Sequence, residues 1–361
     1  MIKFITKYAG ANIKIEKTNE NEVYLRQEIR DTTEWWFYWN FGAVSDCDAE
    51  VTFNFTNGDV IGNFGPAISR DLTEWKYDKE NSFISHHAFK YKLTANKPVY
   101  FAFAAPYQVK DFEKFVKEVS GLKKEYLTVT NGGRNQLFYT FGNEKSNKGF
   151  LIAARHHACE SVASFVLEGL VKYLVENENS VTRDMRLDII PFVDIDGVEN
   201  GDQGKSREPH DHNRDYLEEP LYSTIKAIYG LYENRNLVFA ADLHCPGKYG
   251  GIHDYMSLIE GYDYMAKAQQ DFSDILEEKT NGKDIEYKRK NNVVFGTFWN
   301  KLPCANSLSF FIKKGAKLGF TFENPYVGER DKPYSAEELR AFGENMAKAF
   351  IEYYEKYVLS E

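Results

Sequence analysis

Hydrophobic and polar residues alternate along much of the first hundred positions of the chain. The alternation is clear at residues 50–55, and the polar turn sequence TNGD follows directly at 56–59. This combination is typical of a strand that enters a hairpin. Similar short runs occur at residues 35–41, 88–93 and 99–104. No helical period is visible before about residue 110, so the pattern predicts an all-β antiparallel sandwich domain over residues 1–108.

The run at 35–41 is unusually aromatic. Two tryptophans, a phenylalanine, a tyrosine and a third tryptophan follow one another from Trp35 to Trp39. Such a run could form a surface on which carbohydrate stacks. Aromatic residues are enriched in strands for packing reasons alone, so we interpret the run as a strand in the sandwich core.

From about residue 109 the pattern changes to strands that alternate with helices. Apolar runs predict strands near residues 149–154, 186–193, 237–243 and 318–323. Helical spacing predicts helices near residues 111–119, 160–177, 216–233, 257–279 and 336–358. The last helix opens with Ser335 and Glu338 in a capping-box pattern. The alternation predicts an α/β domain over residues 109–361, with a mostly parallel, mixed sheet of the eight-stranded type flanked by helices.

Composition narrows the class of protein. The chain has 361 residues, of which 43% are hydrophobic and 16% aromatic, enough for two packed domains. Its net charge of −9 argues against general binding to nucleic acids or to anionic membranes. We find no apolar run of membrane-span length, no signal-peptide pattern and no CxxC pair among the four cysteines. We therefore expect a cytoplasmic globular protein without a disulfide framework, whose oligomeric partners the sequence leaves open.

The first candidate for chemistry lies where the predicted strand 149–154 meets the following helix. The sequence there is Arg-His-His-Ala-Cys-Glu, residues 155–160. His157 and Glu160 would lie at the carboxyl edge of the sheet, where open α/β folds bind their ligands. An imidazole nitrogen and a carboxylate oxygen are donors that zinc accepts. One such pair is a weak signal by itself.

Two further candidates end apolar strands. His244 closes the run 237–244, and Glu323 closes the run 318–323. Parallel strands would bring His244 to the same edge as His157, where it could be a third metal ligand. A buried carboxylate needs a partner, and Glu323 would have one as the general base that takes a proton from a metal-activated water.

The loop before residue 216 carries candidates for substrate binding. Asn213 and Arg214 offer an amide beside a planar guanidinium, which suits a two-point grip on a carboxylate. Asp211 could accept a hydrogen bond from the second ring nitrogen of a ligand histidine. His210 and His212 bracket this aspartate, and we interpret them as loop histidines that are not ligands.

Five motifs now stand in order along the chain. They are Ala-Arg-His-His-Ala-Cys-Glu at 154–160, Asp-Ile-Asp-Gly-Val at 194–198, Asp-His-Asn-Arg at 211–214, Asp-Leu-His at 242–244 and Phe-Thr-Phe-Glu at 320–323. Together they resemble the motifs of the M14 zinc metallocarboxypeptidases. The closer likeness is to the cytosolic carboxypeptidase branch, in which a β-sandwich precedes the catalytic domain. Aromatic strands similar to residues 36–39 and a Pro-Tyr pair like 106–107 extend the likeness over nearly the whole chain.

The resemblance implies a reaction and a cofactor. One Zn²⁺ per chain would be held by His157, Glu160 and His244. Zinc would activate a water molecule, with Glu323 as the general base. The chain would then be a metallocarboxypeptidase that hydrolyses the C-terminal peptide bond of a peptide or protein.

The resemblance also implies how substrate is held. Asn213 and Arg214 would bind the C-terminal carboxylate, and Asp211 would orient His157. Thr297, Trp299 and Lys301 fall in the segment that lines the side-chain pocket in relatives, and Lys301 could make that pocket favour acidic residues. A solvated surface lysine is the other interpretation of Lys301.

The chain departs from the family in the loop before Asp211. The family usually has an arginine there that polarises the scissile carbonyl, whereas this chain has Gly-Lys-Ser-Arg at 204–207. Lys205 or Arg207 would have to do that work, and the sequence leaves both open. The usual Asn-Pro-Asp-Gly turn is also altered at 194–195, and no tyrosine that would cover substrate can be placed.

Two alternatives compete with the peptidase. One is a zinc amidohydrolase that cleaves an acyl-amino acid, in the manner of aspartoacylase. The sandwich in front and the turn at 194–198 favour the peptidase. The other alternative is a non-catalytic peptide-binding protein with this fold. The candidate ligands and the candidate base are all present, which argues against a decayed site.

Overall fold

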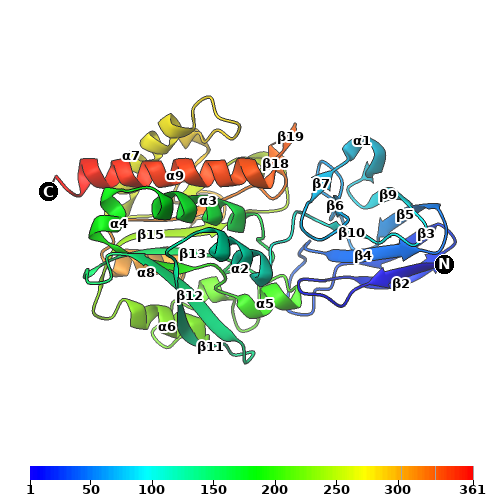
Figure 1. Cartoon of the computed structure of the whole chain (residues 1–361), viewed down its shortest axis with the longest axis horizontal. Coiled ribbons are helices and arrows are strands. Elements are labelled where there is room, and N and C mark those ends of the chain that lie inside the picture. Colours follow the sequence, from blue (N-terminus) through cyan, green and yellow to red (C-terminus); the bar gives the residue numbers. More distant parts are fainter. Residues whose placement is uncertain (302, 330, 361) are drawn as a thin grey trace.

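The computed structural model describes residues 1–301, 303–329 and 331–360, and it consists of two parts that lie side by side (Figure 1). The N-terminal part holds two five-stranded sheets, and the C-terminal part holds a seven-stranded sheet among helices. The first N-terminal sheet runs in the order β1 (Ile2–Ile5), β4 (Asn40–Ser45), β10 (Val99–Ala102), β6 (Ala67–Ser69), β7 (Lys76–Tyr77). The second runs β2 (Lys14–Asn19), β3 (Glu22–Arg26), β5 (Ala49–Phe55), β9 (Ala88–Leu93), β8 (Phe83–Ser85).

The core between these two sheets is aromatic. Phe53 of β5 stacks on Phe89 of β9 with ring centroids 4.7 Å apart, and Phe101 of β10 lies 5.2 Å from Phe53. The expected alternation is present, because every second residue of β5 is buried. The short helix α1 (Lys79–Ser82) precedes β8. The sandwich was expected to be antiparallel, but β3 and β5 pair in parallel. They run the same way because the chain crosses to the other sheet as β4 between them.

The aromatic run at 35–39 is not a strand, contrary to our prediction. Strand β4 begins only at Asn40. Within the run, Phe37 packs edge-on against Tyr326 of the C-terminal part with centroids 5.3 Å apart, while Trp39 lies in the sandwich core, 4.7 Å from Phe55. The backbone N–H of Tyr38 donates to the side chain of Gln203 over 2.9 Å. A side chain of the C-terminal part thus accepts the hydrogen bond that a neighbouring strand would otherwise accept.

The seven-stranded sheet carries the residues of chemical interest. Its order is β11 (Lys123–Val129), β12 (Asn135–Gly142), β14 (Arg186–Ile190), β13 (Lys148–Ala154), β15 (Asn236–His244), β17 (Leu318–Glu323), β16 (Ser257–Ile259). The pairs β14–β13, β13–β15 and β15–β17 are parallel, and the other three are antiparallel. The sheet is therefore mixed, as expected, with seven strands among the described residues in place of the expected eight.

Helices cover both faces of this sheet (Figure 1). One face is covered by α3 (Ala163–Glu176), α7 (Tyr264–Thr280) and α9 (Ala336–Tyr357), and the other by α6 (Ser223–Leu231) and α8 (Ser307–Lys313). The helices α2 (Val109–Glu118), α4 (Ser180–Asp184) and α5 (Ile195–Asn200) lie in the connections. The two-stranded sheet of β18 (Gly328–Glu329) and β19 (Lys332–Pro333) precedes α9. No helix in the described part of the chain combines the length and apolarity needed to cross a membrane.

The helix starts show where the periodicity was a good guide. Ser335 caps α9, and its capping box with Glu338 is present as predicted. The helix expected from residue 216 begins only at Ser223, because Pro220 has no N–H for a helical hydrogen bond. Residues 257–259 were expected to start a helix but form strand β16, which pairs with β17. The hairpin β11–β12 was not predicted.

Candidate metal centre and substrate cavity

The turn after β13 is shaped by a buried arginine. Arg155 has a positive φ of 60° and is only 1% exposed. Its guanidinium donates to the carbonyl of Ala158 (Nε, 3.1 Å) and to the carbonyl of Tyr107 (Nη1, 2.8 Å). The side chain thereby ties the turn to the segment that enters from the sandwich. The tight turn brings His157 and Glu160 to the carboxyl edge of the sheet.

Three potential metal ligands converge at this edge. His157, Glu160 and His244 each offer one donor atom, and these atoms lie within 4.8 Å of one another. Nδ1 of His157 is 2.9 Å from one oxygen of Glu160, and Nδ1 of His244 is 2.8 Å from the other. Glu160 is 1% exposed. Two imidazole nitrogens and a carboxylate oxygen are the donor set of a catalytic zinc site that keeps one position open, so the residues fit the metal that the sequence implies.

The other ring nitrogen of each histidine faces an aspartate. Nε2 of His157 is 3.5 Å from Asp211, and Nε2 of His244 is 2.8 Å from Asp242. An aspartate that accepts the Nε2 proton leaves Nδ1 of the same ring as the donor to a metal. Asp211 is thus placed where the sequence analysis expected it. Asp242 does the corresponding work for His244 and was not predicted.

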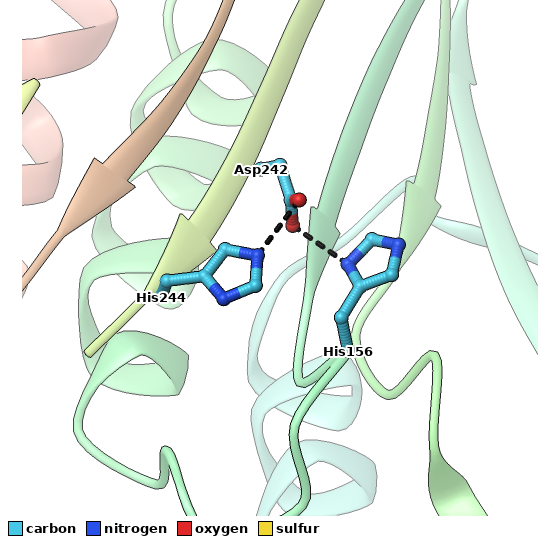
Figure 2. Close-up of side chains that lie close together, drawn as sticks. All are labelled: His156, Asp242 and His244. Carbon is cyan, nitrogen blue, oxygen red and sulfur yellow. Dashed lines mark hydrogen bonds and ion pairs between the residues drawn. The ribbon is translucent and has the colours of Figure 1, made fainter. Parts of the chain in front are cut away.

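Asp242 links His244 to a second histidine (Figure 2). Its other oxygen lies 2.8 Å from Nδ1 of His156, whose Nε2 lies 2.7 Å from the hydroxyl of Tyr216. The hydroxyl of Ser307 also donates to Asp242. His156, Asp242 and His244 form a second group of potential metal ligands, since their donor atoms also lie within 4.8 Å of one another. Both nitrogens of His156 are already paired, however, so we assign the group to the support of His244. An acidic residue inside an apolar strand, two positions before a ligand, is the sequence signal that could have revealed it.

Glu323 lies beside the metal ligands. It pairs with His244 in the register of β15 and β17, so the sheet itself fixes the two residues side by side. The carboxyl group is 7% exposed, and its Oε2 has no hydrogen-bond partner among the described residues. Burial, and the nearby charge of Glu160, raise the pKa of Glu323 to about 7. A carboxyl group with a pKa near neutrality, aimed at a metal site, has the properties of a general base.

The two candidate cations for the carbonyl have different surroundings. Arg207 is paired with three carboxylates, Asp194 at 2.7 Å, Asp31 at 3.1 Å and Asp202 at 3.4 Å. It is not among the residues that line the cavity described below. Lys205 does line that cavity, and its Nζ is 2.7 Å from Glu160.

Lys205 is held by more than one group. Its ammonium also donates to the carbonyl of Cys245 over 3.2 Å and lies 4.6 Å from the centroid of the Trp36 ring. Burial opposes the charged form, but the neighbouring carboxylate of Glu160 raises the pKa of Lys205 above its ordinary value. The group is therefore a cation beside the metal ligands.

Only glycine fits at position 204, directly before this lysine, in the observed backbone conformation. Its φ is +78°, and a Cβ added there would lie 2.1 Å from the backbone nitrogen of Ala158. The loop therefore packs its bare backbone against the metal-ligand turn. No side chain can emerge at 204, and the next position, Lys205, supplies the charge.

A cavity of about 340 Å³ collects the candidate residues. It includes the three potential ligands, Glu323, Lys205, Asp211, Asn213 and Arg214. The amide of Asn213 is anchored, since its Oδ1 accepts from the backbone of Ser307 over 3.0 Å. Arg214 is exposed and donates to the carbonyl of Asn213 over 2.9 Å. The rest of the wall is formed by Trp36, Ser206, Cys245, Pro246, Gly247, His253, Ile259, Trp299, Asn300, Cys304, Asn306 and Thr321.

Besides Arg207, the sequence candidates Thr297, Lys301, His210 and His212 are not among the residues that line this cavity. Lys301 is exposed and is not among the lining residues. His210 lies 2.6 Å from Asp215, and the ring of His212 stacks on Tyr222 with centroids 3.6 Å apart. Neither histidine belongs to a group of potential metal ligands among the described residues.

The fold and the site define a metallohydrolase of the carboxypeptidase class. Residues 113–257 match the family model described as zinc carboxypeptidase, peptidase family M14. The chain is 24% identical over 412 aligned positions to cytosolic carboxypeptidase 6 of Caenorhabditis elegans, covering 98% of this chain and 87% of that protein. It is 22% identical to an uncharacterized protein of Zymomonas mobilis, covering 73% of this chain and 72% of that one.

Solved structures resemble the fold of this chain over nearly its whole length. The crystal structure of a metallo-carboxypeptidase from Burkholderia cenocepacia has a TM-score of 0.80 at 16% identity and covers 99% of this chain and 100% of its own. A metallo-carboxypeptidase from Pseudomonas aeruginosa in complex with (2-guanidinoethylmercapto)succinic acid has a TM-score of 0.77 at 17% identity, covering 97% and 98%. At these identities the likeness concerns the fold. The family match over residues 113–257 adds that this part of the chain is similar to the M14 zinc carboxypeptidases.

Proposed function

We propose that the protein is a zinc-dependent carboxypeptidase that releases one residue from the C-terminus of a peptide or protein. One observation carries the proposal. The His157–Glu160–His244 group, the unpartnered carboxyl oxygen of Glu323 and the exposed guanidinium of Arg214 share a single cavity. Metal ligands, a base and an anchor for a negative charge are the parts that this reaction needs.

Each part has a task in the reaction. His157, Glu160 and His244 would hold one zinc ion. When bound there, zinc would supply Lewis-acid chemistry. Glu323 would take a proton from the attacking water and deliver it to the leaving amine, as its raised pKa suits both directions of transfer.

Two cationic groups would bind the substrate. Asn213 and Arg214 would receive the terminal carboxylate at the exposed end of the cavity. Lys205 would stand at the scissile carbonyl. We choose it over Arg207 because Arg207 is held by three carboxylates outside the cavity, whereas Lys205 lines the cavity next to Glu160.

The proposed binding of the substrate's C-terminal carboxylate by Asn213 and Arg214 gives a direct test of this function. The wild-type protein should cleave blocked dipeptides with a free C-terminal acid and fail on the same peptides when they are C-terminally amidated. Arg214→Ala should raise KM for the acids by roughly tenfold or more, since a charge-assisted hydrogen-bond pair is lost. Arg214→Lys should restore little, because a point charge does not reproduce the planar fork. Equal kcat/KM for acid and amide peptides would contradict the assignment.

The same assay separates the peptidase from the acyl-amino-acid hydrolase. Both substrates end in a free carboxylate, so N-acyl amino acids are compared with blocked dipeptides that carry the same terminal residue. Trp36 of the N-terminal part lines the cavity together with residues of the C-terminal part. A cavity formed by both parts favours a substrate that extends beyond one acyl group.

We also place the boundary between the two domains near residue 108, just before α2.

We further propose that the released residue has an uncharged side chain. Apart from the residues already given a task, the wall includes Ile259, Thr321, Asn300 and Cys304, none of them charged. His253 also lines it, and burial lowers the pKa of this histidine, which favours its uncharged form. Lys301, which could have favoured acidic residues, is not part of the wall.

Peptides that differ only in the last residue test this preference. We expect kcat/KM for terminal Leu or Phe to exceed that for Glu or Lys by about tenfold or more, since burying an unpaired charge is costly. Lys301→Ala should leave the ranking unchanged. A preference for terminal Glu that disappears in Lys301→Ala would show that the lysine reaches the substrate after all.

A further inference from the structure

The loop that carries Lys205 is bonded to a short segment of the sandwich. Asp31 accepts hydrogen bonds from the backbone N–H groups of Gln203 (3.0 Å) and Gly204 (2.8 Å), the two residues directly before the lysine. The carbonyl of Ser206, directly after it, accepts from the backbone N–H of Thr33 over 3.0 Å. Both sides of the lysine are therefore fixed by residues from the other part of the chain.

Gln203 joins this segment to the metal-ligand turn. Its side chain is fully buried and pairs with the backbone N–H and carbonyl of Tyr38, each over 2.9 Å. Its own carbonyl accepts from the N–H of Cys159 over 3.1 Å, one residue before the ligand Glu160. The contacts run without a gap from the sandwich through the loop to the ligand turn.

Trp36 contacts the side chain of Lys205 directly. Its ring lies 4.6 Å from the ammonium of Lys205, and its indole N–H donates to the hydroxyl of Ser206 over 3.3 Å. A lysine needs such support more than an arginine does, because its charge sits at the end of a flexible stem without a planar fork. A ring face beside the ammonium attracts the charge and restricts where it can lie.

We propose that segment 28–38 of the sandwich acts as a template for the loop 202–207, with Asp31 and Trp36 as positioning residues that hold the Lys205 ammonium at the metal ligands. The inference gives the N-terminal domain a role in turnover. It rests on the proposed function in so far as Lys205 is taken to act on the scissile carbonyl.

A double-mutant cycle tests whether Trp36 acts through Lys205. Trp36→Leu should lower kcat by about 3- to 30-fold, the range of a partly desolvated cation–π contact, with KM and zinc content little changed. Trp36→Phe keeps a ring face and should retain most of the turnover. In a Lys205→Met background, Trp36→Leu should cost no more than about a further twofold, because the partner is already gone.

The alternative outcomes of the cycle are distinct. Equal losses from Trp36→Leu in both backgrounds would mean that the ring acts elsewhere, and this result would overturn the inference. Unchanged kcat in Lys205→Met would remove the assigned role of the lysine and the inference with it. Trp35→Leu is the matched control, since Trp35 is 39% exposed, does not line the cavity and contacts Lys248 in place of Lys205.

Hydrogen exchange tests the template without any substrate. Asp31→Asn should raise amide exchange in residues 202–207 while the strands of the sandwich stay protected. Asp71→Asn is the control, because Asp71 likewise accepts two backbone N–H groups, from Thr73 (2.8 Å) and Glu74 (3.0 Å), inside the sandwich. Unchanged exchange of the loop in Asp31→Asn would overturn the template. Since this measurement needs no turnover, a wild-type protein inactive on peptides would count against the proposed function alone.

Discussion

Replacement of Glu323 by glutamine is expected to lower kcat by roughly 10²–10⁴, the usual contribution of a positioned general base. The amide keeps the shape of the carboxyl group but cannot accept a proton. The zinc content should stay at about one ion per chain, because Glu323 is not among the grouped ligands. The measurement is kcat at saturating blocked dipeptide together with metal analysis of the same sample. Wild-type turnover in the variant would require another residue to be the base.

The control for this substitution is a second buried glutamate. Glu260 is 6% exposed, accepts a hydrogen bond from Asn292 over 3.2 Å and does not line the cavity. Glu260→Gln changes the same atoms as Glu323→Gln and should leave kcat within about twofold, as expected for a change away from the chemistry. A large loss in both variants would point to a general effect of removing a buried charge.

The second large effect is expected at the metal. His157→Ala or His244→Ala removes one of three ligand atoms, so zinc should be lost on dialysis and activity with it. Asp242→Asn should have a graded effect, with zinc affinity lowered about 10- to 100-fold and activity restored by excess zinc, because Asp242 orients the ligand His244 and is not itself in the His157–Glu160–His244 group. The number of zinc ions per chain after dialysis, together with a zinc titration, distinguishes the loss of a ligand in the histidine variants from the weakened affinity in Asp242→Asn.

His87→Ala provides the control for the histidine variants. This histidine lies in the sandwich with 62% of its side chain exposed, and the potential metal ligands do not include it. It should keep full zinc occupancy. Full occupancy in His244→Ala as well would remove His244 from the ligand set and move the search to the other donors of the cavity.

The fold could be predicted best where one local signal decided it. The strands that end at Ala154, His244 and Glu323 were located to within a few residues, because long apolar runs are buried from both faces. The segment 35–39 misled us for the opposite reason. Its residues are as hydrophobic as a core strand, but Phe37 and Tyr38 have partners in the C-terminal part, Tyr326 and Gln203. No local pattern carries that information.

The candidate site likewise contains residues that the sequence could group in advance and a choice that it could not make. Residues that end parallel strands could be grouped in advance, since all such strands end at one edge, and the structure brings His157, Glu160, His244 and Glu323 together. Their roles remain predictions. The choice between Lys205 and Arg207 was beyond the sequence, because it depends on carboxylates from three separate segments that surround the arginine.

The hydrogen bonds between Asp31 and the loop before Lys205 also constrain how this protein can diverge. A recombination event at the domain boundary would join a loop shaped for one sandwich to a different one. The hybrid would keep every residue that touches zinc and still lack the arrangement that places the cation. The two domains are therefore expected to be inherited as one unit, and a substitution in 28–38 to be accepted mainly with a compensating change in 202–207.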